Sequence, residues 1–340
     1  MTPSDPIAAP HVWTRRQVLS GLAVAAAGAA GLWGFREWQK PTLTAETFIG
    51  AAASYDRDLS DVMSRGFREL GVTSDEIKGK RILLKPNLVE TSEQATHINT
   101  HPLVVRAAAE AFLRLGAQRV VVAEGPGHRR DTLAVLEESG LESVLYEDRI
   151  PFLDINYMEG IVVPNAGGRS PLRSLTFPAL LRDTDWIVSV AKLKTHHWAG
   201  VTLSMKNLFG LMPGRYYGWP KNALHVAGIQ ECIVDIVATA KPHFAIIDGI
   251  VGMEGDGPIM GTPREAGVLI MGRNCTAVDA TAARVMQINP HRVEYLTEAE
   301  DWLGPVTESR IMQRGEAILS VQKPFELVEG IPSQVGLRLS

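Results

Sequence analysis

The sequence predicts a single α/β domain built on a mostly parallel, doubly wound β-sheet. Four short apolar runs, each bounded by polar or turn residues, have the composition of buried parallel strands. Amphipathic segments lie between several of these runs, which gives the alternating strand and helix order of an α/β fold. The four runs cover residues 81–84, 120–123, 186–191 and 244–247.

The first elements of the domain follow this order. Residues 47–52 form an apolar run that suits a first strand, and residues 59–70 have the pattern of a helix. Asp58 or Ser60 can cap that helix through a side-chain oxygen, and Gly71 can end it.

A second helix is predicted to begin at Pro102, whose fixed φ suits the first turn, and to end at Gly116. A third helix follows from about Asp131. Residues 141–178 then interrupt the alternation, because two short apolar runs lie there among loops rich in Pro, Gly and Asn. We predict a small antiparallel excursion from the main sheet in this region.

The later elements restore the α/β pattern. Residues 222–240 predict one long amphipathic helix, with Val226 on its apolar face and Pro242 just beyond its end. A further strand over residues 267–271 and a helix over residues 277–286 follow.

The amino-terminal segment has the pattern of a twin-arginine export signal. Arg15 and Arg16 precede the weakly hydrophobic Ala/Gly-rich residues 21–32. We therefore assign residues 1–40 to a signal segment and residues 46–340 to one α/β domain.

This signal predicts passage through the twin-arginine translocase and a periplasmic or otherwise extracytoplasmic location. Proteins on this route fold before export, often because a cofactor is inserted first. An uncleaved signal that anchors the protein to the membrane is an alternative, although the apolar stretch is short for a bilayer core of about 30 Å.

Composition excludes several classes of protein. The chain has 340 residues and a formal net charge of -4, and no basic stripe with interleaved aromatic residues is present, so we expect no nucleic-acid partner. Its two cysteines, Cys232 and Cys275, cannot hold a four-thiolate iron–sulfur cluster. They are either a disulfide or two small buried hydrophobic side chains.

The apolar runs share one feature: each stops at polar or charged residues. Ligands of open parallel sheets bind outside the carboxyl ends of the strands. If the four strands are neighbours, their terminal polar side chains therefore meet at one edge: Lys85, Asn87, Glu124, Lys192, Lys194, Asp248 and Asp256.

The segment that follows residue 191 is rich in cations and predicts a site for a carboxylate or phosphate. A solvated basic loop is the alternative. Adjacent histidines point apart on most backbones, so only one of His196 and His197 is expected in the crevice, and His196 is preferred. The predicted substrate-binding residues are Lys85, Asn87, Asn207 and His196.

Proton transfer needs a side chain that can take a proton from the substrate or give one to it. Glu124 is the candidate proton-transfer residue, and the cations at the strand end would stabilise the anionic group. No Gly-x-Ser-x-Gly elbow or Cys-His pair is visible. The predicted catalytic residues are Glu124, Lys192, Lys194 and Lys206.

Residues 254–258 form a loop in which glycine separates two carboxylates, a pattern that can bend around a hard divalent cation. An Asp-Gly turn explains the same residues, and both interpretations remain open. Asp279 is a possible additional ligand. The predicted metal ligands are Asp248, Glu254, Asp256 and His225.

Several blocks in residues 82–286 resemble the family called domain of unknown function 362. Many of its members carry a ferredoxin-like iron–sulfur module, and the resemblance therefore suggests electron transfer in those relatives. The two cysteines here cannot supply such a cluster. The blocks are Lys85-Pro86-Asn87, Glu124-Gly125, Lys192-Leu193-Lys194-Thr195-His196, Lys206-Asn207-Leu208-Phe209-Gly210, His225, Asp248-Gly249, Glu254-Gly255 and Asp279.

Together these observations predict an exported, metal-dependent enzyme that acts on a small anionic substrate. The alternative is an exported protein without chemistry of its own, which binds an anionic ligand or helps to mature a redox complex.

Overall fold

The protein is described by a computed structural model over residues 43–339, except Arg57, residues 92–94 and residues 128–129. The predicted export signal lies outside the described residues. Residues from Leu43 onward cluster into one compact unit. Within the described part of the chain, no helix is both long and apolar enough to cross a membrane.

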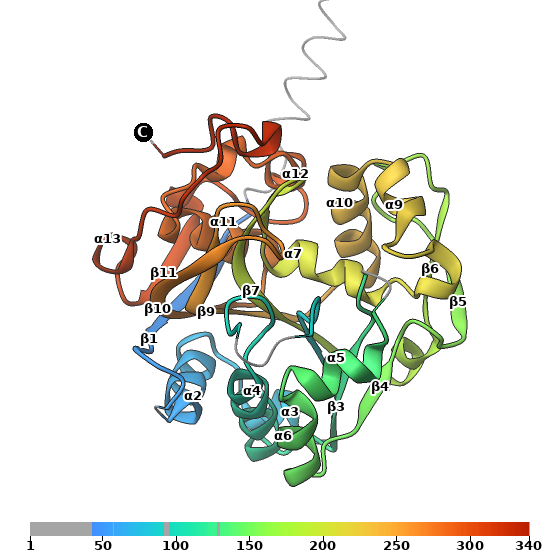
Figure 1. Ribbon diagram of the computed structural model, residues 1–340. Coiled ribbons are helices and arrows are strands. Elements are labelled where there is room, and N and C mark those ends of the chain that lie inside the picture. The colour runs from blue at the N-terminus through green and yellow to red at the C-terminus, as the bar shows by residue number, and fades with distance from the viewer. Residues whose placement is uncertain (1–42, 57, 92–94, 128–129, 340) are drawn as a thin grey trace, which may run out of the picture. The chain divides into compact units, whose positions relative to one another are not determined.

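A nine-stranded sheet forms the centre of the described residues (Figure 1). Its strand order is β11-β1-β10-β9-β7-β2-β3-β4, and β8 pairs with β7. All strands except β8 and β10 run in the same direction. The strands are β1 (Ala45–Ala51), β2 (Arg81–Pro86), β3 (Arg119–Glu124), β4 (Phe152–Asp154), β7 (Trp186–His196), β8 (Gly200–Thr202), β9 (Phe244–Glu254), β10 (Thr262–Gly272) and β11 (Ile311–Gly315).

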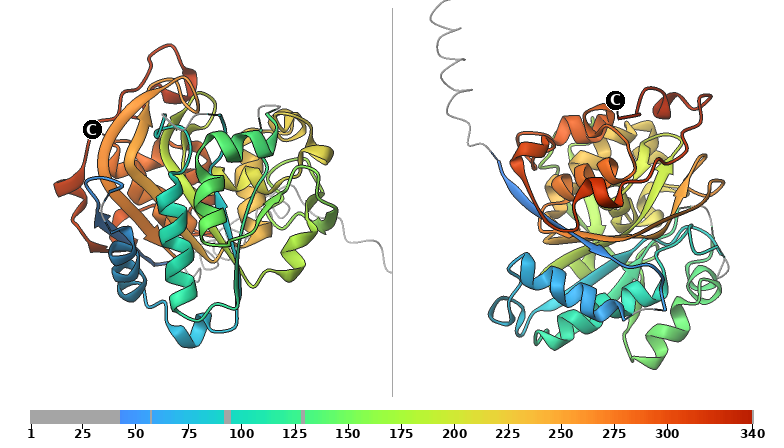
Figure 2. Two further views of the ribbon diagram at one scale, coloured as in Figure 1. Left: turned by 60° about the horizontal axis from the view of Figure 1, so that its bottom comes forward. Right: turned by 90° about the vertical axis from the view of Figure 1, so that its left-hand side faces the viewer.

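Helices cover both faces of this sheet, as the two views of Figure 2 show, so the fold is a mostly parallel α/β sheet as predicted. The described helices before β4 are α2 (Leu59–Glu69), α3 (Ser74–Ile77), α4 (Pro102–Arg114), α5 (Thr132–Glu138) and α6 (Leu141–Glu147). Those after β6 are α7 (Ser204–Asn207), α8 (Gly214–Tyr217), α9 (Asn222–Val226), α10 (Ile229–Ala240), α11 (Cys275–Val285), α12 (Glu294–Ala299) and α13 (Ile318–Val321). Short 3-10 helices occur at Ala179–Asp183, Leu208–Leu211, Pro290–Arg292, Glu308–Arg310 and Pro332–Gln334.

Side chains of the strands belong to two hydrophobic cores, one on each face of the sheet. Successive side chains of a strand point to opposite faces. In β2, Leu83 belongs to the core that contains residues of α10 and α11, whereas Ile82 and Leu84 belong to the core that contains residues of α2 and α4. Both faces of the strand are therefore apolar, which explains the uninterrupted hydrophobic runs in the sequence.

The four strands are neighbours in the sheet, as the expected convergence of their polar ends requires. β2 pairs in parallel with β3 and with β7, and β7 pairs in parallel with β9. The carboxyl ends of these strands therefore lie side by side at one edge of the sheet.

Two local predictions need correction. The antiparallel excursion is limited to β5 (Gly160–Pro164) and β6 (Ser174–Pro178), because α6 is helical and β4 joins the main sheet in parallel with β3. The long helix predicted over residues 222–240 is divided into α9 and α10 at Gly228, where φ is 107°. Val226 precedes this break and is exposed instead of lying on a buried face.

Candidate functional site

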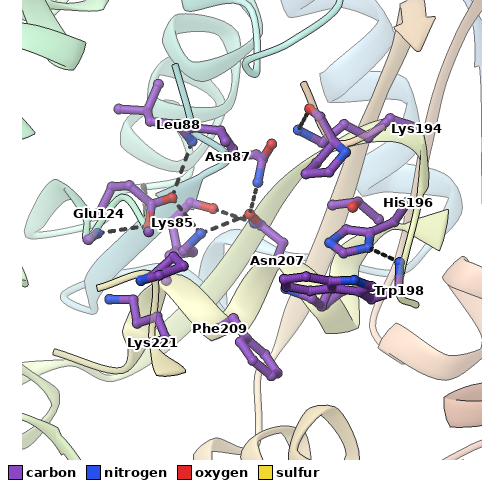
Figure 3. Close-up of a pocket in the computed structure, with 18 of the residues that line it drawn as sticks. Lys85, Asn87, Leu88, Glu124, Lys194, His196, Trp198, Asn207, Phe209 and Lys221 are labelled. Carbon is purple, nitrogen blue, oxygen red and sulfur yellow. Dashed lines mark hydrogen bonds and ion pairs between the residues drawn. The ribbon is translucent and has the colours of Figure 1, made fainter. Parts of the chain in front are cut away.

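A cavity of about 110 Å³ lies at the carboxyl ends of β2, β3 and β7 (Figure 3). Asn87 and Glu124 lie on one side of it, and Lys194 and His196 lie on the other. Its wall includes eight of the predicted site residues: Lys85, Asn87, Glu124, Lys194, His196, Lys206, Asn207 and His225.

The short helix α7 carries Lys206 and Asn207 into the cavity wall, and Asp279 of α11 fixes its first turn. The Asp279 carboxylate accepts hydrogen bonds from the backbone N–H groups of Ser204 and Met205, at 2.8 and 3.0 Å. Burial raises the pKa of Asp279 to about 7, although these donors oppose the shift. Asp279, considered above as a metal ligand, is therefore a positioning residue for α7.

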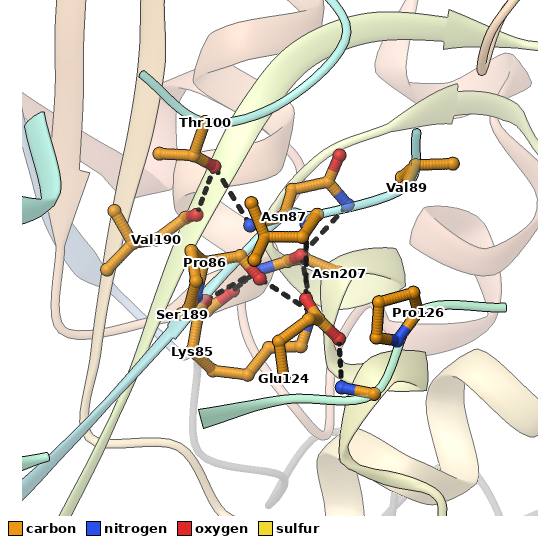
Figure 4. Close-up of polar contacts among 12 residues, drawn as sticks. Lys85, Pro86, Asn87, Val89, Thr100, Glu124, Pro126, Ser189, Val190 and Asn207 are labelled. Atoms are coloured by element: carbon orange, nitrogen blue, oxygen red, sulfur yellow. Dashed lines mark hydrogen bonds and ion pairs between the residues drawn. The ribbon is translucent and has the colours of Figure 1, made fainter. Parts of the chain in front are cut away.

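Lys85 and Glu124 form a buried ion pair at the base of the cavity (Figure 4). Lys85 Nζ donates to Glu124 Oε2 at 2.5 Å, to Asn207 Oδ1 at 2.8 Å and to its neighbour's backbone carbonyl at 2.8 Å. An ammonium has three donors, so none remains for a ligand. Glu124 also accepts from the backbone N–H groups of Gly125 and Leu88. Lys85 and Glu124 thus neutralise each other and hold the wall in place.

Gly210 lets this pair approach the chain closely. A Cβ atom at this position would overlap the side chains of Glu124 and Lys85. Any side chain would therefore displace the ion pair, which gives a physical reason for glycine at the end of the block Lys206-Asn207-Leu208-Phe209-Gly210.

Asn207 and Asn87 differ in how completely they are hydrogen-bonded. Asn207 accepts from Lys85 and from Asn87 Nδ2, and its own Nδ2 donates to Lys85 O and to Ser189 Oγ. Asn87 is 7% exposed, and within the described residues its Oδ1 has no hydrogen-bond partner. The hydroxyl of Thr202, which is 4% exposed, also has none there. Both residues line the cavity, so a ligand that hydrogen-bonds to them would satisfy these atoms.

Lys194 and Lys221 have some of their donors occupied by fixed acceptors. Lys194 Nζ donates to the carbonyls of Ile98 and Pro258, at 2.9 and 3.2 Å. Lys221 Nζ donates to Asn156 Oδ1 at 2.8 Å and to the carbonyl of Met212. Burial lowers the pKa of Lys194 well below its usual value and lowers the pKa of Lys221 to about 7. When protonated, each ammonium keeps one donor for a ligand.

Lys206 is different from the other lysines of the cavity. In the described part of the chain, no hydrogen-bond acceptor or carboxylate contacts its Nζ, which lies 4.0 Å from the centre of the Phe209 ring. Burial, and next the charge of Lys85, lower the pKa of Lys206 to about 7, while Glu124 opposes the shift.

The hydrogen bonds of the two predicted histidines define their neutral tautomers. His196 Nδ1 accepts from the backbone N–H groups of Trp198 and Ala199, at 2.9 and 3.2 Å, so the proton of the neutral ring is on Nε2. His225 Nδ1 lies 3.1 Å from the carbonyl of Lys221, which can only accept, so this nitrogen carries the proton. Burial lowers the pKa of His196 well below its usual value, which favours the neutral ring.

Both adjacent histidines line the cavity, which corrects the expectation that only one would. His196 is buried, whereas the side chain of His197 is 32% exposed and lies 3.5 Å from Asp256. The chain reverses direction from β7 into β8 immediately after His196, and this turn brings both rings to the cavity.

Lys192 and Asp248, predicted at the same site, form a separate buried pair. Their strands place them directly opposite each other, and Lys192 Nζ lies 2.7 Å from Asp248 Oδ2. The Tyr55 hydroxyl donates to Asp248 at 3.0 Å and accepts from Lys192, and the His101 backbone N–H also donates to Asp248. We call these four residues the Lys192 cluster.

The predicted metal ligands are not brought together. Asp248 belongs to the Lys192 cluster, and Glu254 contacts Arg264 and the backbone N–H of Glu326. Asp256, in contrast, lies beside His197. Within the described residues, no group of three or more His, Cys, Asp or Glu side chains could hold a metal ion.

Sequence reasoning missed Lys221 and Thr202. Lys221 lies in a loop with φ of 69°, and no strand end or charge cluster marks it in the sequence. Thr202 belongs to the short strand β8, which was not predicted. Cys232 and Cys275 are both buried and free, so they contribute no disulfide.

The fold and the cavity define an α/β protein with a lysine-rich pocket at the carboxyl edge of a parallel sheet. The chain belongs to the family described as domain of unknown function (DUF362), whose sequence model matches residues 82–284. The eight predicted residues that line the pocket all lie in this range.

The chain is also similar to the Thylakoid-associated protein sll1697 of Synechocystis sp. (strain ATCC 27184 / PCC 6803 / Kazusa). The two are 28% identical over 229 residues, which cover 65% of this chain and 68% of that protein.

Two solved structures give weaker similarities, each with a TM-score of 0.38. One is a protein from Thermotoga maritima, at 16% identity over 66% of this chain and 57% of that one. The other is the lactate racemase apoprotein from Thermoanaerobacterium thermosaccharolyticum, at 14% identity over 63% of this chain and 52% of that one. The chain thus spans little more than half of either structure, and at this TM-score the similarities carry no argument about activity.

Proposed function

We propose that the pocket binds a small anionic substrate, a carboxylate or a phosphate, and that the protein is an exported enzyme acting on it. The observation that carries this proposal is the lysine content of the pocket wall. Four lysines line the pocket, and Glu124 is the single carboxylate among the described residues that line it. Because Glu124 is paired with Lys85, the other three lysines have no carboxylate partner in the described wall, and an anion that binds there would favour their protonated forms.

The anionic group would be held by Lys194 and Lys221. Each has two donors fixed on protein acceptors, which orients the remaining donor. The Nε2–H of His196 supplies a neutral donor in the same wall. Lys206, which has no fixed acceptor among the described residues, is left for chemistry, because an amine with a pKa of about 7 can both donate and accept a proton at neutral pH.

A second feature narrows the substrate class. Asn87 Oδ1 is a buried acceptor without a partner in the described structure, and leaving such an atom unpaired costs about 1–3 kcal/mol. A ligand that carries a hydroxyl or amine hydrogen beside its anionic group would recover this energy. We therefore expect glycolate to bind more tightly than acetate.

The test is calorimetric titration of the full-length protein with acetate, glycolate and inorganic phosphate at pH 8. Because an anion favours charged lysines, binding is expected to take up protons at Lys206 and Lys221, each of which has a pKa of about 7. Repeating the titration in buffers of different ionisation enthalpy measures this uptake. Lys221→Met should weaken binding about tenfold, whereas Lys323→Met, at an exposed lysine that does not line the pocket, should leave it unchanged.

Absence of binding by all three anions, or equal effects of the two variants, would contradict the proposal. Binding without any chemical change in a screen of small anions would favour the non-catalytic alternative, an exported ligand-binding or accessory protein. No step of the proposal passes through a metal, because the predicted ligands are not gathered in one place.

The export component of the proposal rests on the sequence of residues 1–40. Fractionation of the producing cells, with a variant in which Arg15 and Arg16 are both replaced by lysine, tests it. The proposal expects the wild type outside the cytoplasm and the variant retained inside. An unchanged distribution would overturn it.

A further inference from the structure

We propose that Lys206 forms a covalent imine with a carbonyl group of the substrate, which makes the substrate a small oxo acid. The inference rests on the proposed function, since the other pocket lysines would bind the carboxylate of the same molecule.

The comparison among the pocket lysines carries this inference. Lys85 has three hydrogen-bond acceptors, and Lys194 and Lys221 have two each. Such bonds restrain the nitrogen and occupy its hydrogens. Lys206 has none within the described residues, and its nitrogen contacts an aromatic face that offers no proton acceptor of comparable strength. Its nitrogen is therefore the one among these four that can turn toward a ligand without breaking a hydrogen bond.

The surroundings of Lys206 favour the neutral amine, which is the nucleophilic form. Among the described residues, the charged or titratable groups that interact electrostatically with Lys206 include Lys85, Glu124, Lys194, His196 and Lys221. Three of these are lysines and one is a carboxylate already paired with Lys85, so their charges disfavour a further cation. With a pKa of about 7, roughly half of Lys206 is unprotonated at neutral pH, about a thousandfold more than for an ordinary lysine.

The chemical step is balanced without an oxidant or reductant. The Nζ lone pair attacks the carbonyl carbon and forms a C–N bond, while the carbonyl π electrons move to oxygen, which gains a proton. The resulting hydroxyl takes a second proton and leaves as water when the nitrogen lone pair forms the C=N bond. The two protons lost by the amine are the two hydrogens of the water.

Two wall residues suit this step. The hydroxyl of the intermediate can donate to Asn87 Oδ1, which has no partner within the described residues, and it can accept a hydrogen bond from the Nε2–H of the neutral His196 ring. The proton that makes water the leaving group comes from the Lys206 nitrogen. Asn87 and His196 lie in the wall of the cavity (Figure 3), which Lys206 also lines.

The experiment is reductive trapping in the full-length protein. Pyruvate is the probe, and its amide, which has the same ketone without the charge, is the matched control. Each is incubated with the protein and sodium cyanoborohydride, and the labelled lysine is identified by peptide mass spectrometry. We expect one reduced adduct per chain, on Lys206, formed at least tenfold faster with pyruvate than with pyruvamide.

Variants sharpen the result. Lys206→Met and Lys206→Arg should lose the adduct, and Lys323→Met should keep it. Peptide mapping of the wild type gives the site even if a Lys206 variant fails to fold. Adducts spread over exposed lysines, or labelling that survives Lys206→Met, would overturn the inference.

The failure of this inference can be told from failure of the proposed function. If anions bind in the calorimeter but no adduct forms at Lys206, the imine inference is wrong and the proposed anion site is still supported. If Lys206 is trapped at equal rates with pyruvate and pyruvamide and no anion binds, the proposed anion site is wrong. The assignment of the substrate to the oxo acids is then wrong as well.

Discussion

The Lys192 cluster and the pocket around Lys206 both contain lysine at the same edge of the sheet, yet their hydrogen bonding differs. In the Lys192 cluster, the carboxylate of Asp248 accepts from Lys192, Tyr55 and the backbone of His101. The Tyr55 hydroxyl in turn accepts from the backbone N–H of Val251. In the pocket, Asn87 Oδ1 and the Thr202 hydroxyl lack partners within the described residues, and Lys206 has no acceptor there.

This difference separates a structural group from a binding site. A buried polar group without a partner costs free energy, so a folded chain keeps such groups where a ligand or water completes them. The Lys192 ammonium is paired with a carboxylate, and no buried side-chain atom of the Lys192 cluster lacks a partner within the described residues, so we assign the cluster to stability. The pocket is incomplete, and we assign it to binding.

The largest effect is expected from breaking the Lys192 cluster. Asp248→Asn leaves the buried ammonium of Lys192 without a countercharge and should reduce the free energy of unfolding by about 3–5 kcal/mol. Urea denaturation measures this change. Asp256→Asn, at a side chain that is 51% exposed, is the matched control and should change stability by less than about 0.5 kcal/mol. A loss below about 1 kcal/mol in Asp248→Asn would mean that the cluster is not a structural pair.

Lys206→Met should affect binding more than stability. Removing a cation that has no acceptor in the described structure should leave the free energy of unfolding unchanged or raise it by up to about 1 kcal/mol. Because a bound anion favours the protonated form of Lys206, the loss of this amine should weaken glycolate binding about tenfold. Denaturation and calorimetry on the same preparation separate the two effects. A large loss of stability would mean that Lys206 is a structural residue, as Lys192 is.

The pH dependence of stability offers a third comparison. The pKa of Lys206 is about 7 in the folded protein and about 10.4 in an unfolded chain, so the unfolded state binds more protons between these values. The stability of the wild type relative to Lys206→Met should therefore rise as the pH increases from 7 to 10, by at least about 1 kcal/mol. Urea midpoints of both proteins across this range test the sign. A constant difference would show that Lys206 has an ordinary pKa.

The smallest effect is expected from Thr202→Val, which replaces an unpaired hydroxyl with a methyl group of similar size. Stability should change by less than about 0.5 kcal/mol, because no protein hydrogen bond is lost among the described residues. Glycolate binding should weaken several-fold while acetate binding stays the same. Equal effects on both anions would mean that this hydroxyl does not contact the ligand.

The sequence predicted the sheet better than it predicted the site. Two-sided apolar runs identify buried parallel strands, and their polar ends predicted an edge of the sheet at which eight of the twelve predicted site residues line the pocket. The predicted metal ligands do not meet in the described structure, for a local reason. The chain remains a β-strand as far as Glu254, and Asp248 is paired across to Lys192, so the carboxylates do not share a site. Neither fact can be read from glycine and carboxylate spacing.

The amino-acid sequence by itself determined the α/β class, the positions along the chain of the strands that carry the site and the family blocks that supply most of its lysines. Only the tertiary structure decided which lysine is a structural residue and which one is open to a ligand. The physical reason is that a buried ammonium is stabilised by its acceptors, and these come from distant parts of the chain. Lys194 finds them at Ile98 and Pro258, Lys221 finds them at Asn156 and Met212, and Lys206 finds none in the part of the protein that the structure describes.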